Sequence, residues 1–418
     1  MEKYIINGGN RLEGKVEVSS SKNAVLPMIA ASILTKEQVV IKNCPQILDV
    51  KNMLEILNFI GAKTSFNDNN LVVSSKNVES VYINENLTEK LRSSIYLLGA
   101  LLCRFKKIRI AYPGGCKIGK RPIDIHLNCL RALGVNCIEE DGSVSCSIDK
   151  KEGGECALCF PSVGATENLI LFSVICKGIT TIHNCAKEPE IIDLCKMLNL
   201  MGAKIYGAGT KTIRIEGVKK LNGIEFLPMK DRIETGTFVL AVAINGGNLE
   251  INGCNRENIS PLLDKICKTT CKVGIKNDII NIKSGVMQNS ISFTTGPYPL
   301  FPTDLMAQTL VLATILNGRS YIRENIFEDR FQFVKWLIKM GAKINIKGNL
   351  AIVEGVKALS GCPVYAEDLR GGAALVLAGL VSKGQTEVNG IKHIERGYEN
   401  FTEKLLAIGA DIKRTKDR

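Results

Sequence analysis

The segment Leu54-Glu-Ile-Leu-Asn-Phe-Ile-Gly61-Ala-Lys63 decides the fold, because its pattern returns along the chain. The side chains of Leu54, Leu57 and Ile60, with those of Val50 and Met53, recur at the spacing of one helical face. Glycine often closes a helix, because the closing position needs a positive φ. The pattern therefore predicts an amphipathic helix that ends at Gly61 and leads directly into a strand.

The same sequence pattern ends in a glycine at Gly134, Gly202, Gly341 and Gly409, and a degenerate copy without glycine lies around Thr270. The copies follow one another at intervals of about 70 residues, and a fixed period of this kind indicates internal duplication. We therefore predict six structural repeats of nearly equal length.

Each predicted repeat has the same parts in the same order. A strand comes first, then a very apolar helix, a short strand, the helix that ends in glycine, and further strands. The apolar helices are predicted at 24–34, 95–103, 169–176, 238–244, 305–316 and 373–381. The repeat is a βαβαββ unit, and the chain is predicted to be an α/β protein with sheets outside and apolar helices inside.

The two ends of the chain complete each other. Only nine residues follow Gly409, too few for the strands that the other repeats have. Residues 1–21 are therefore predicted to supply the missing strands of the sixth repeat.

Three repeats then form each of two domains. One spans 22–229 and carries the loop around Cys116; the other joins 1–21 to 230–418. The second domain carries Asp304, Arg370 and Arg396. Because the chain crosses twice between the domains, we expect a hinge and an active site in the cleft between them.

Composition limits the classes of function. The 418 residues are 45% hydrophobic and 23% charged, as in soluble globular proteins. The net charge of +12 suits anionic partners, but the cations are dispersed without runs or interleaved aromatic residues, so nucleic acid is not predicted. No apolar run approaches the roughly 20 residues of a membrane span, so no membrane association is predicted.

The cysteines and histidines narrow the chemistry further. The chain has 15 cysteines, an odd number scattered through apolar segments, which indicates reduced, buried thiols in the cytoplasm. The single CxxC, Cys156 to Cys159, lacks a second ligand pair, so a core position is favoured over a metal site. With only three histidines, proton transfer is expected to fall to carboxylates, lysine or cysteine. Neither metal nor cofactor is predicted.

The loop Tyr112-Pro-Gly-Gly-Cys-Lys-Ile-Gly-Lys-Arg-Pro122 is the most unusual stretch of the chain. Its glycines permit tight turns and leave backbone N–H groups uncovered. Lys117, Lys120 and Arg121 favour an anionic ligand, and such neighbours also lower the pKa of a thiol, so Cys116 is predicted to be reactive. The alternative is an ordinary surface loop with a chance cysteine.

Cations also gather where helices are predicted to begin. Equivalent positions in repeats face the same way, so these helix starts should converge on one surface of each domain, where helix N-termini attract anions. The cations at the starts of the apolar helices are Lys22, Arg92, Arg232 and Arg370. A second tier, at the starts of the helices that end in glycine, consists of Cys116, Arg121, Glu188, Arg330 and Arg396. The alternative is that each cation is a solvated cap or ion pair, and that Glu188 and Asp231 are simple N-caps.

Asp304 is the best candidate for a general base. It follows Phe301-Pro-Thr in an apolar and aromatic stretch, where a carboxylate is unexpected unless it has a task.

A set of motifs resembles the UDP-N-acetylglucosamine 1-carboxyvinyltransferase family, the enolpyruvyl transferases that begin bacterial peptidoglycan synthesis. The motifs are Lys22-Asn23, Pro113-Gly-Gly-Cys116-x-x-Gly-x-Arg121-Pro122, Ser162-Val-Gly-Ala-Thr166, Glu188-Pro-Glu190, Asp231-Arg232-Ile-Glu-Thr-Gly236, Phe301-Pro-Thr-Asp304, Asp368-Leu-Arg370 and Arg396-Gly-Tyr398. They occur in the family's order and spacing. The resemblance implies a two-domain inside-out α/β barrel with three repeats per domain.

The resemblance also implies substrates and roles. Phosphoenolpyruvate carries a phosphate and a carboxylate, and Lys22, Arg121 and Arg396 match the cations that hold them, joined by Arg330 and Arg370. Contacts to UDP-N-acetylglucosamine match Asn23, Arg92, Arg121, Pro122, Ile123, Asp124, Ile125, Phe160, Pro161, Ser162, Val163, Gly164, Asp304 and Ile326. Glu188, Asp231, Arg232 and Asp368 complete the implied binding set. Where the family usually has Lys or Arg before the Ser-Val-Gly run, this chain has Phe160.

The implied reaction needs no cofactor. Asp304 takes the proton from the 3′-hydroxyl of the sugar as that oxygen attacks phosphoenolpyruvate, and phosphate leaves later. Cys116 matches the proton donor of the family, which is also the cysteine alkylated by the epoxide fosfomycin. Catalytic roles therefore fall to Cys116, Asp304, Lys22 and Arg396.

Two alternatives stay open. The sister enzyme that acts on shikimate 3-phosphate shares the implied fold but lacks the cysteine loop, and its Asn-Ala-Gly-Thr-Ala-x-Arg motif is absent here. A non-catalytic repeat protein that binds anions or nucleic acid would leave Asp304 and Cys116 without a role.

Overall fold

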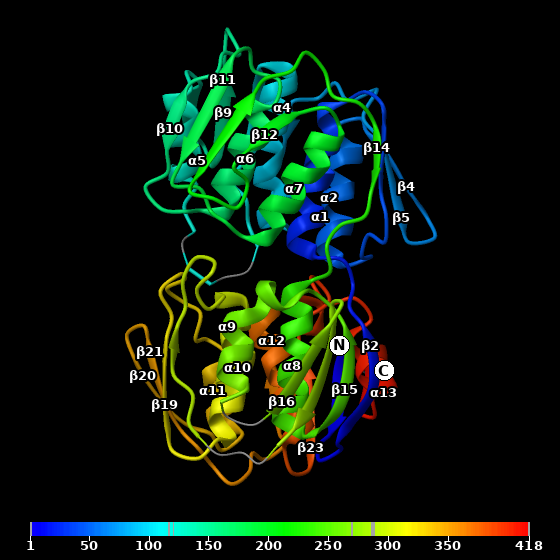
Figure 1. Cartoon of the computed structure of the whole chain (residues 1–418), viewed down its shortest axis with the longest axis vertical. Helices are drawn as coiled ribbons and strands as arrows, with labels where there is room; N and C mark the ends of the chain where they lie inside the picture. Colours follow the sequence, from blue (N-terminus) through cyan, green and yellow to red (C-terminus); the bar gives the residue numbers. More distant parts are fainter. Residues whose placement is uncertain (1, 116–117, 120, 269–270, 286–288, 417–418) are drawn as a thin grey trace. The chain divides into compact units, whose positions relative to one another are not determined.

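The computed structural model describes residues 2–115, 118–119, 121–268, 271–285 and 289–416 (Figure 1). Its contacts divide the chain into two compact units. The inserted unit consists of Ser20–Gly115 and Pro122–Met229, and the terminal unit of Met1–Ser19, Cys116–Arg121 and Lys230–Arg418. Each is described by itself.

The inserted unit contains three repeats. The first has α1 (Lys22–Ala31), the 3₁₀ helix η1 (Ser32–Leu34), β3 (Gln38–Ile41), α2 (Leu48–Phe59), β4 (Lys63–Asn67), β5 (Asn70–Ser74) and β6 (Tyr82–Ile83). The second has α3 (Glu85–Thr88), η2 (Arg92–Ile95), α4 (Tyr96–Phe105), β7 (Lys107–Ala111), α5 (Asp124–Ala132), β8 (Asn136–Glu140), β9 (Ser143–Ser147) and β10 (Glu155–Ala157). The third has α6 (Val163–Ser173), β11 (Ile179–His183), α7 (Pro189–Leu200), β12 (Lys204–Tyr206), β13 (Thr212–Glu216) and β14 (Ile224–Phe226).

The terminal unit repeats this order. The fourth repeat has α8 (Arg232–Asn245), β15 (Gly247–Asn252), α9 (Arg256–Ile266), β16 (Cys271–Lys276), β17 (Ile279–Ser284) and β18 (Phe293–Thr294). The fifth has η3 (Thr303–Leu305), α10 (Met306–Ile315), β19 (Arg319–Arg323), α11 (Val334–Lys339), β20 (Lys343–Lys347), β21 (Leu350–Glu354) and β22 (Pro363–Tyr365). The sixth has α12 (Leu369–Val381), β23 (Gln385–Asn389), η4 (Ile391–His393), α13 (Phe401–Ala407), β24 (Asp411–Lys416), and then β1 (Glu2–Asn7) and β2 (Leu12–Glu17) from the other end of the chain.

The last strand of each repeat pairs with a strand in the sheet of the next repeat. The described strands form six four-stranded sheets, three in each unit. In the inserted unit β6 pairs in parallel with β7, β10 with β11, and β14 with β3. In the terminal unit β18 pairs with β19, β22 with β23, and β2 with β15. Three repeats therefore close into a ring within each unit.

The chain ends meet in one sheet, as the sequence predicts. Strand β1 lies between β23 and β24 and pairs antiparallel with both. Residues 2–7 and 12–17 thus supply the last two strands of the sixth repeat, in the arrangement that the other five repeats have.

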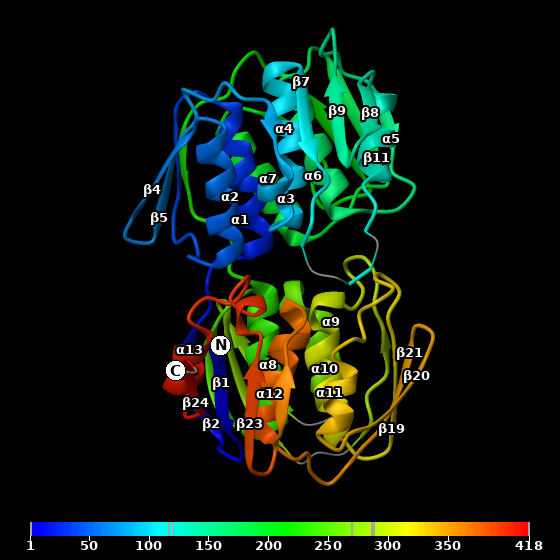
Figure 2. The ribbon, with the colours of Figure 1, turned by 180° about the vertical axis from the view of Figure 1, so that it is seen from behind.

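Apolar helices occupy the middle of each unit, with the sheets around them (Figures 1 and 2). In α12, every residue from Leu369 to Leu380 is buried, and α8 is buried from Arg232 to Ile244. The predicted α/β fold class is confirmed, and burial of these helices on all sides explains why their sequences lack a polar face.

Glycine closes the second helix of five repeats, as predicted. Gly61 has a φ of +103°, and Gly134, Gly202, Gly341 and Gly409 have φ values between +85° and +104°. A side chain is strained in this region of φ, so the helix ends there. The copy in the fourth repeat, around Thr270, lies outside the described residues.

The loop around Cys116 is divided differently from the sequence-based division. Cys116–Arg121 is grouped with the terminal unit, where the backbone N–H of Asp329 donates to the carbonyl of Ile118 at 3.2 Å. The domains 22–229 and 1–21 with 230–418 stay a prediction, since a unit of contacts is not by itself a unit that folds alone.

Candidate functional site

The carboxylate of Asp304 is held by two arginines in the terminal unit. Nη2 of Arg330 donates to its Oδ1 at 2.9 Å, and Nη2 of Arg370 donates to its Oδ2 at 2.9 Å. Both arginine side chains are buried, whereas that of Asp304 is 27% exposed. Two buried guanidinium groups therefore hold a carboxylate that is still partly exposed.

The start of α12 positions Arg370. Asp368 is the N-cap, and its Oδ1 accepts from the backbone N–H groups of Arg370 at 2.9 Å and Gly371 at 3.1 Å. The guanidinium group of Arg370 lies 5.4 Å from the ring centroid of Tyr398. Burial lowers the pKa of Arg370, but the carboxylate of Asp304, together with Tyr398 and Asp231, outweighs burial and raises it above the ordinary value. Arg370 therefore remains cationic although it is buried.

Asp368 and Phe327 also support Arg330. Nη1 of Arg330 lies 3.7 Å from Oδ1 of Asp368, and its guanidinium carbon lies 5.6 Å from the centroid of Phe327. The guanidinium group of Arg121 lies 5.2 Å from the same ring. Three of the predicted cations, Arg121, Arg330 and Arg370, are therefore brought close to Asp304 or to a shared aromatic neighbour.

The helix-cap interpretation holds for Asp231. Its Oδ1 accepts from the N–H groups of Ile233 at 2.7 Å and Glu234 at 3.0 Å, which caps α8. The adjacent Arg232 is buried, with its guanidinium carbon 5.9 Å from the centroid of Tyr298.

The remaining predicted residues of the terminal unit lie in loops. Ile326 donates its N–H to Oε1 of Glu324 at 2.7 Å. Arg396 lies between η4 and α13, close enough to His393 for its charge to lower the pKa of that histidine, which burial lowers first. Cys116 lies outside the described residues.

In the inserted unit, Arg92 contacts the backbone at both ends of the 112–122 loop. Its Nη1 donates to the carbonyl of Pro113 at 3.3 Å and its Nη2 to that of Pro122 at 3.4 Å. Ile123 is the N-cap of α5, followed by Asp124 and Ile125 in its first turn. Arg92 therefore connects the loop to the start of α5.

The starts of α5 and α6 are joined through His126. Nδ2 of Asn168, in α6, donates to Nδ1 of His126 at 2.9 Å. Burial, assisted by the charge of Arg92, lowers the pKa of His126 to about 3, so the ring is neutral at physiological pH. A Cβ added at Gly164 would lie 3.2 Å from this ring. Ser162 caps α6 by accepting from the N–H of Ala165 at 3.4 Å, and Val163 follows it.

Lys22 is the first residue of α1. Its Nζ donates to Oδ2 of Asp49, at the start of α2, at 2.8 Å, and both side chains are largely buried. Asn23 follows in α1. Glu188 occupies the N-cap position of α7 without capping it through its side chain, and its Oε2 accepts from the N–H of Lys187 at 3.0 Å.

Sequence reasoning missed Glu167. This residue lies in the apolar helix α6 and is fully buried. Burial raises its pKa well above the ordinary value for glutamate; Tyr96 opposes the shift, whereas Glu190 and Glu188 add to it. A charged residue inside the apolar segment 163–173 was the available signal.

Glu167→Gln is expected to remove a pH-dependent loss of stability. Above the unfolded pKa of about 4.3, the unfolded chain releases a proton that folded Glu167 keeps, so stability falls as the pH rises toward the folded pKa. As the pH rises, the free energy of unfolding of the original protein should fall by up to about 1.4 kcal/mol per pH unit more than that of the variant. Urea unfolding at several pH values between 5 and 9 measures this difference. Parallel curves would contradict a raised pKa at Glu167.

Comparisons with known proteins identify the family. Residues 6–405 match the family described as EPSP synthase (3-phosphoshikimate 1-carboxyvinyltransferase). UDP-N-acetylglucosamine 1-carboxyvinyltransferase 2 of Caldanaerobacter subterraneus subsp. tengcongensis is 47% identical over 415 residues, covering 99% of this chain and 100% of the relative. The protein of the same name from Clostridium tetani is 44% identical over 416 residues, with the same coverage. The chain belongs to the UDP-N-acetylglucosamine 1-carboxyvinyltransferase family.

Solved structures agree with this family assignment. The enolpyruvyl transferase NikO from Streptomyces tendae matches with a TM-score of 0.88 and 25% identity, covering 100% of this chain and 99% of that one. EPSP synthase from Acinetobacter baumannii matches with a TM-score of 0.73 and 16% identity over the whole of both chains, which shows the shared fold. The chain is thus a transferase with the enolpyruvyl transferase fold.

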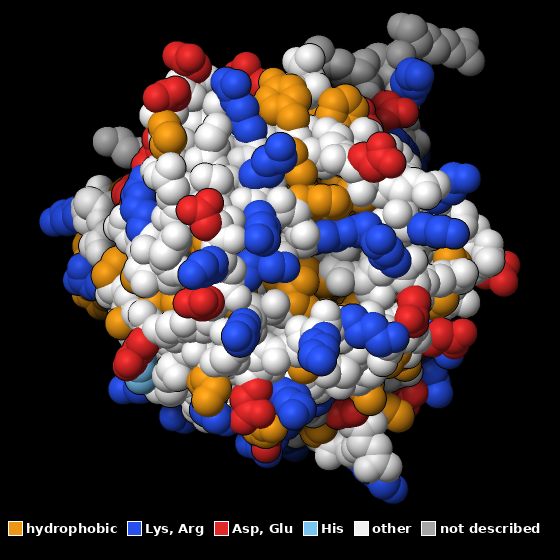
Figure 3. All heavy atoms as spheres, turned by 90° about the horizontal axis from the view of Figure 1, so that it is seen from above, with side chains coloured by type: hydrophobic (Ala, Val, Ile, Leu, Met, Phe, Trp, Pro, Cys, Tyr) orange, Lys and Arg blue, Asp and Glu red, His pale blue; other side chains and the backbone are white. Residues whose placement is uncertain are grey.

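The described part of the chain shows neither a cluster of metal ligands nor a membrane-spanning helix. No three or more His, Cys, Asp or Glu side chains are placed there to hold a metal ion. None of the described helices has the length and apolarity needed to cross a membrane. On the face seen in Figure 3, Lys and Arg side chains are spread between acidic, polar and apolar ones.

Proposed function

We propose that this chain transfers the enolpyruvyl group of phosphoenolpyruvate to the 3′-hydroxyl of UDP-N-acetylglucosamine and releases phosphate. This is the first committed step of bacterial peptidoglycan synthesis, and we place it in the cytoplasm. The observation that carries the proposal is the carboxylate of Asp304, held at 2.9 Å by two buried arginines, in a chain whose full-length relatives bear this enzyme's name.

Asp304 is proposed as the general base. A base must lie within hydrogen-bonding reach of the hydroxyl proton that it removes, and the 27% exposure of the Asp304 side chain supports access of a substrate hydroxyl to it. Arg330 and Arg370 fix its orientation, since each oxygen accepts from a different arginine. Because their positive charges persist, they also stabilise negative charge that develops nearby during the reaction.

The phosphoenolpyruvate site is proposed to consist of Lys22, Arg121 and Arg396. Arginine binds carboxylate and phosphate oxygens through two N–H groups at once, and lysine binds them as a point charge. Lys22 is held by Asp49 at 2.8 Å, so its ammonium group is pre-positioned. The nucleotide sugar is proposed to contact the starts of α1, η2, α5 and α6, together with Asp304 and Ile326.

Phosphate release with two acceptors tests this proposal. Phosphoenolpyruvate and UDP-N-acetylglucosamine together are expected to release one phosphate per enolpyruvyl group transferred, whereas phosphoenolpyruvate with shikimate 3-phosphate is expected to release none. Phosphate release with shikimate 3-phosphate but not with UDP-N-acetylglucosamine would show that the proposed acceptor is wrong. If no phosphate is released with either acceptor, the non-catalytic alternative is favoured.

Phe160→Lys is expected to improve binding of the nucleotide sugar. The phenyl ring is 41% exposed just before the cap of α6, at a position where the family usually has a cation. An exposed charge pair contributes about 0.4–1 kcal/mol, so the KM for UDP-N-acetylglucosamine should fall about 2–5-fold while that for phosphoenolpyruvate stays unchanged. Phe59→Lys, the same change at another exposed phenyl ring, is the control. Equal effects from both variants would point to general charge attraction.

A further inference from the structure

Two cysteines lie opposite each other on the hairpin formed by β8 and β9. In the antiparallel register of these strands, Cys137 is the direct partner of Cys146. Directly opposed residues have Cα atoms about 4.5–5.5 Å apart, within the range that a disulfide spans. Sγ of Cys146 lies 3.1 Å from Sγ of Cys137 and donates its S–H to it.

The hairpin is held in this geometry by its neighbours. Nη2 of Arg131, in α5, donates to the carbonyl of Cys137 at 3.1 Å and to Oε1 of Glu139 at 3.1 Å. The hydroxyl of Tyr112 donates to Oε2 of Glu139 at 2.7 Å, and its N–H donates to the carbonyl of Gly142 at 2.9 Å. The two sulfurs therefore need only side-chain rotation to approach bonding distance.

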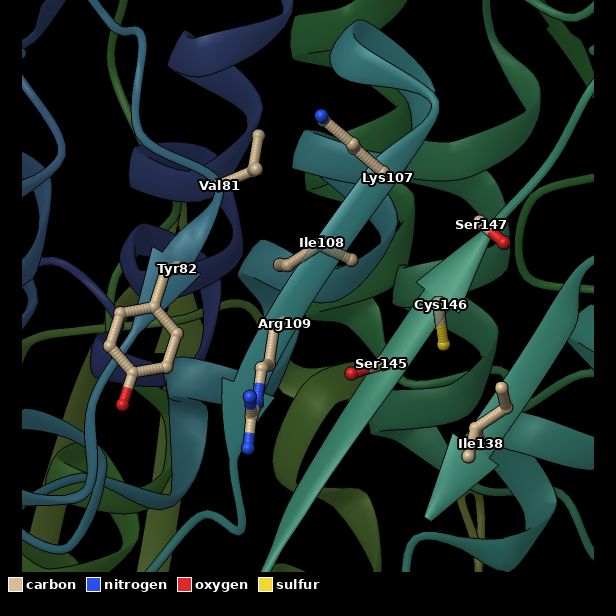
Figure 4. A pocket seen from close by; sticks show the side chains of 9 residues that line it. All are labelled: Val81, Tyr82, Lys107, Ile108, Arg109, Ile138, Ser145, Cys146 and Ser147. Atoms are coloured by element: carbon tan, nitrogen blue, oxygen red, sulfur yellow. The ribbon is translucent and has the colours of Figure 1, made fainter. Parts of the chain in front are cut away.

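Solvent exposure distinguishes Cys137 from the other cysteines of the inserted unit that lie near a second cysteine. Cys103 and Cys176 are buried, as are Cys129 and Cys156, whereas Cys137 is partly exposed on the edge strand β8. Cys146 is buried but is one of the residues that line a cavity of about 550 Å³ beside β6, β7, β8 and β9 (Figure 4). The hydrogen bond from the thiol of Cys146 lowers the pKa of Cys137 and the charge of Arg131 assists, although partial burial opposes the shift. Cys137 thus meets the conditions for a nucleophilic thiolate.

We propose that Cys137 and Cys146 form an oxidisable dithiol that exchanges with small disulfides. The thiolate of Cys137 attacks one sulfur of the disulfide RS–SR, which gives a Cys137–S–SR mixed disulfide and releases RS⁻. The Cys146 sulfur then attacks Cys137, and the second RS⁻ leaves with the proton of Cys146. The protein loses two electrons to the small disulfide, which becomes two thiols. In a reducing cytoplasm small thiols return the disulfide to the dithiol, so the disulfide forms only under oxidising conditions.

Glutathione disulfide tests the proposal on the full chain. After graded exposure, acid quenching and alkylation of the remaining thiols, tryptic digestion places Cys137 and Cys146 alone in the peptide 132–150. This peptide is expected to escape alkylation and to be lighter by two hydrogens, while peptides with Cys129, Cys156, Cys103 and Cys176 remain fully alkylated. A peptide 132–150 that stays alkylated at both thiols, while another pair oxidises or none does, would overturn the proposal.

Two serine variants test the order of the steps. Cys146→Ser is expected to accumulate the glutathione mixed disulfide on Cys137, and Cys137→Ser to label Cys146 about tenfold more slowly. Cys159→Ser, which removes an exposed thiol of the same unit, should leave the oxidation of 132–150 unchanged. Thermal unfolding of each variant shows that the hairpin still folds. Faster labelling of Cys146 than of Cys137 would contradict the assigned attacking thiol.

Discussion

Asp304→Asn is expected to lower turnover by about 10²–10⁴-fold, while the KM values for both substrates change only a few-fold. The amide cannot accept the proton of the sugar hydroxyl. Its NH₂ group also faces an arginine that donates to the carboxylate at 2.9 Å in the original protein, so one of the two hydrogen bonds is lost. Steady-state kinetics of phosphate release, with each substrate varied in turn, measure the effect.

The same variant carries a stability cost that must be separated from the loss of a base. Removing one partner of a buried ion pair costs about 3–5 kcal/mol, and less is expected here because Asp304 is 27% exposed and Arg330 also lies 3.7 Å from Asp368. Urea unfolding gives this cost, and kinetics are measured where the variant is fully folded.

Glu324→Gln is the matched control. The carboxylate of Glu324 accepts from the hydroxyl of Thr303 at 2.9 Å and from the N–H of Ile326 at 2.7 Å, so the control makes the same chemical change beside Asp304. We expect turnover of this variant to stay within a few-fold of the original. If Asp304→Asn has near-normal turnover, or if both variants lose activity equally, Asp304 has only a positioning role.

The fold could be predicted from the sequence because local signals repeat. A glycine that needs a positive φ ends the second helix of five repeats, and such a residue is visible in the sequence. The pairing of each repeat's last strand with the sheet of the next repeat was not predicted, since β6, β10 and β14 have only two or three residues and pair across repeats. Short strands carry little periodicity of their own.

The candidate site could be predicted only as a set of residue types. Asp304 and Arg370 were both chosen, but the hydrogen bond between them joins residues 66 apart in the sequence, and only the ring of repeats brings them together. Asp49, the partner of Lys22, lies in the first turn of α2 and was not singled out from the sequence. Which carboxylate pairs with which cation depends on tertiary structure, which the repeat period does not specify.

Fosfomycin is expected to form one covalent adduct per chain, located on Cys116. Attack by a thiolate opens the epoxide, and the cations proposed to bind phosphoenolpyruvate attract the drug's phosphonate. Of the fourteen other cysteines, ten are buried, whereas Cys159 and Cys267 are exposed and Cys137 and Cys362 are partly so. These four are the internal controls, because exposure alone would label them too. Peptide mass spectrometry after treatment, with and without UDP-N-acetylglucosamine, locates the adduct and gives its rate.

Replacing Cys116 separates its role as an acid from its role as a nucleophile. Cys116→Asp keeps a group that ionises and lacks the sulfur, so it should turn over and resist fosfomycin at concentrations about 100-fold higher than those that inactivate the original enzyme. Cys116→Ser should be much less active, because a hydroxyl is a poor acid near neutral pH. Adducts spread over Cys159, Cys267 and others, or an inactive aspartate variant that folds normally, would contradict the assignment of Cys116 as both proton donor and fosfomycin target.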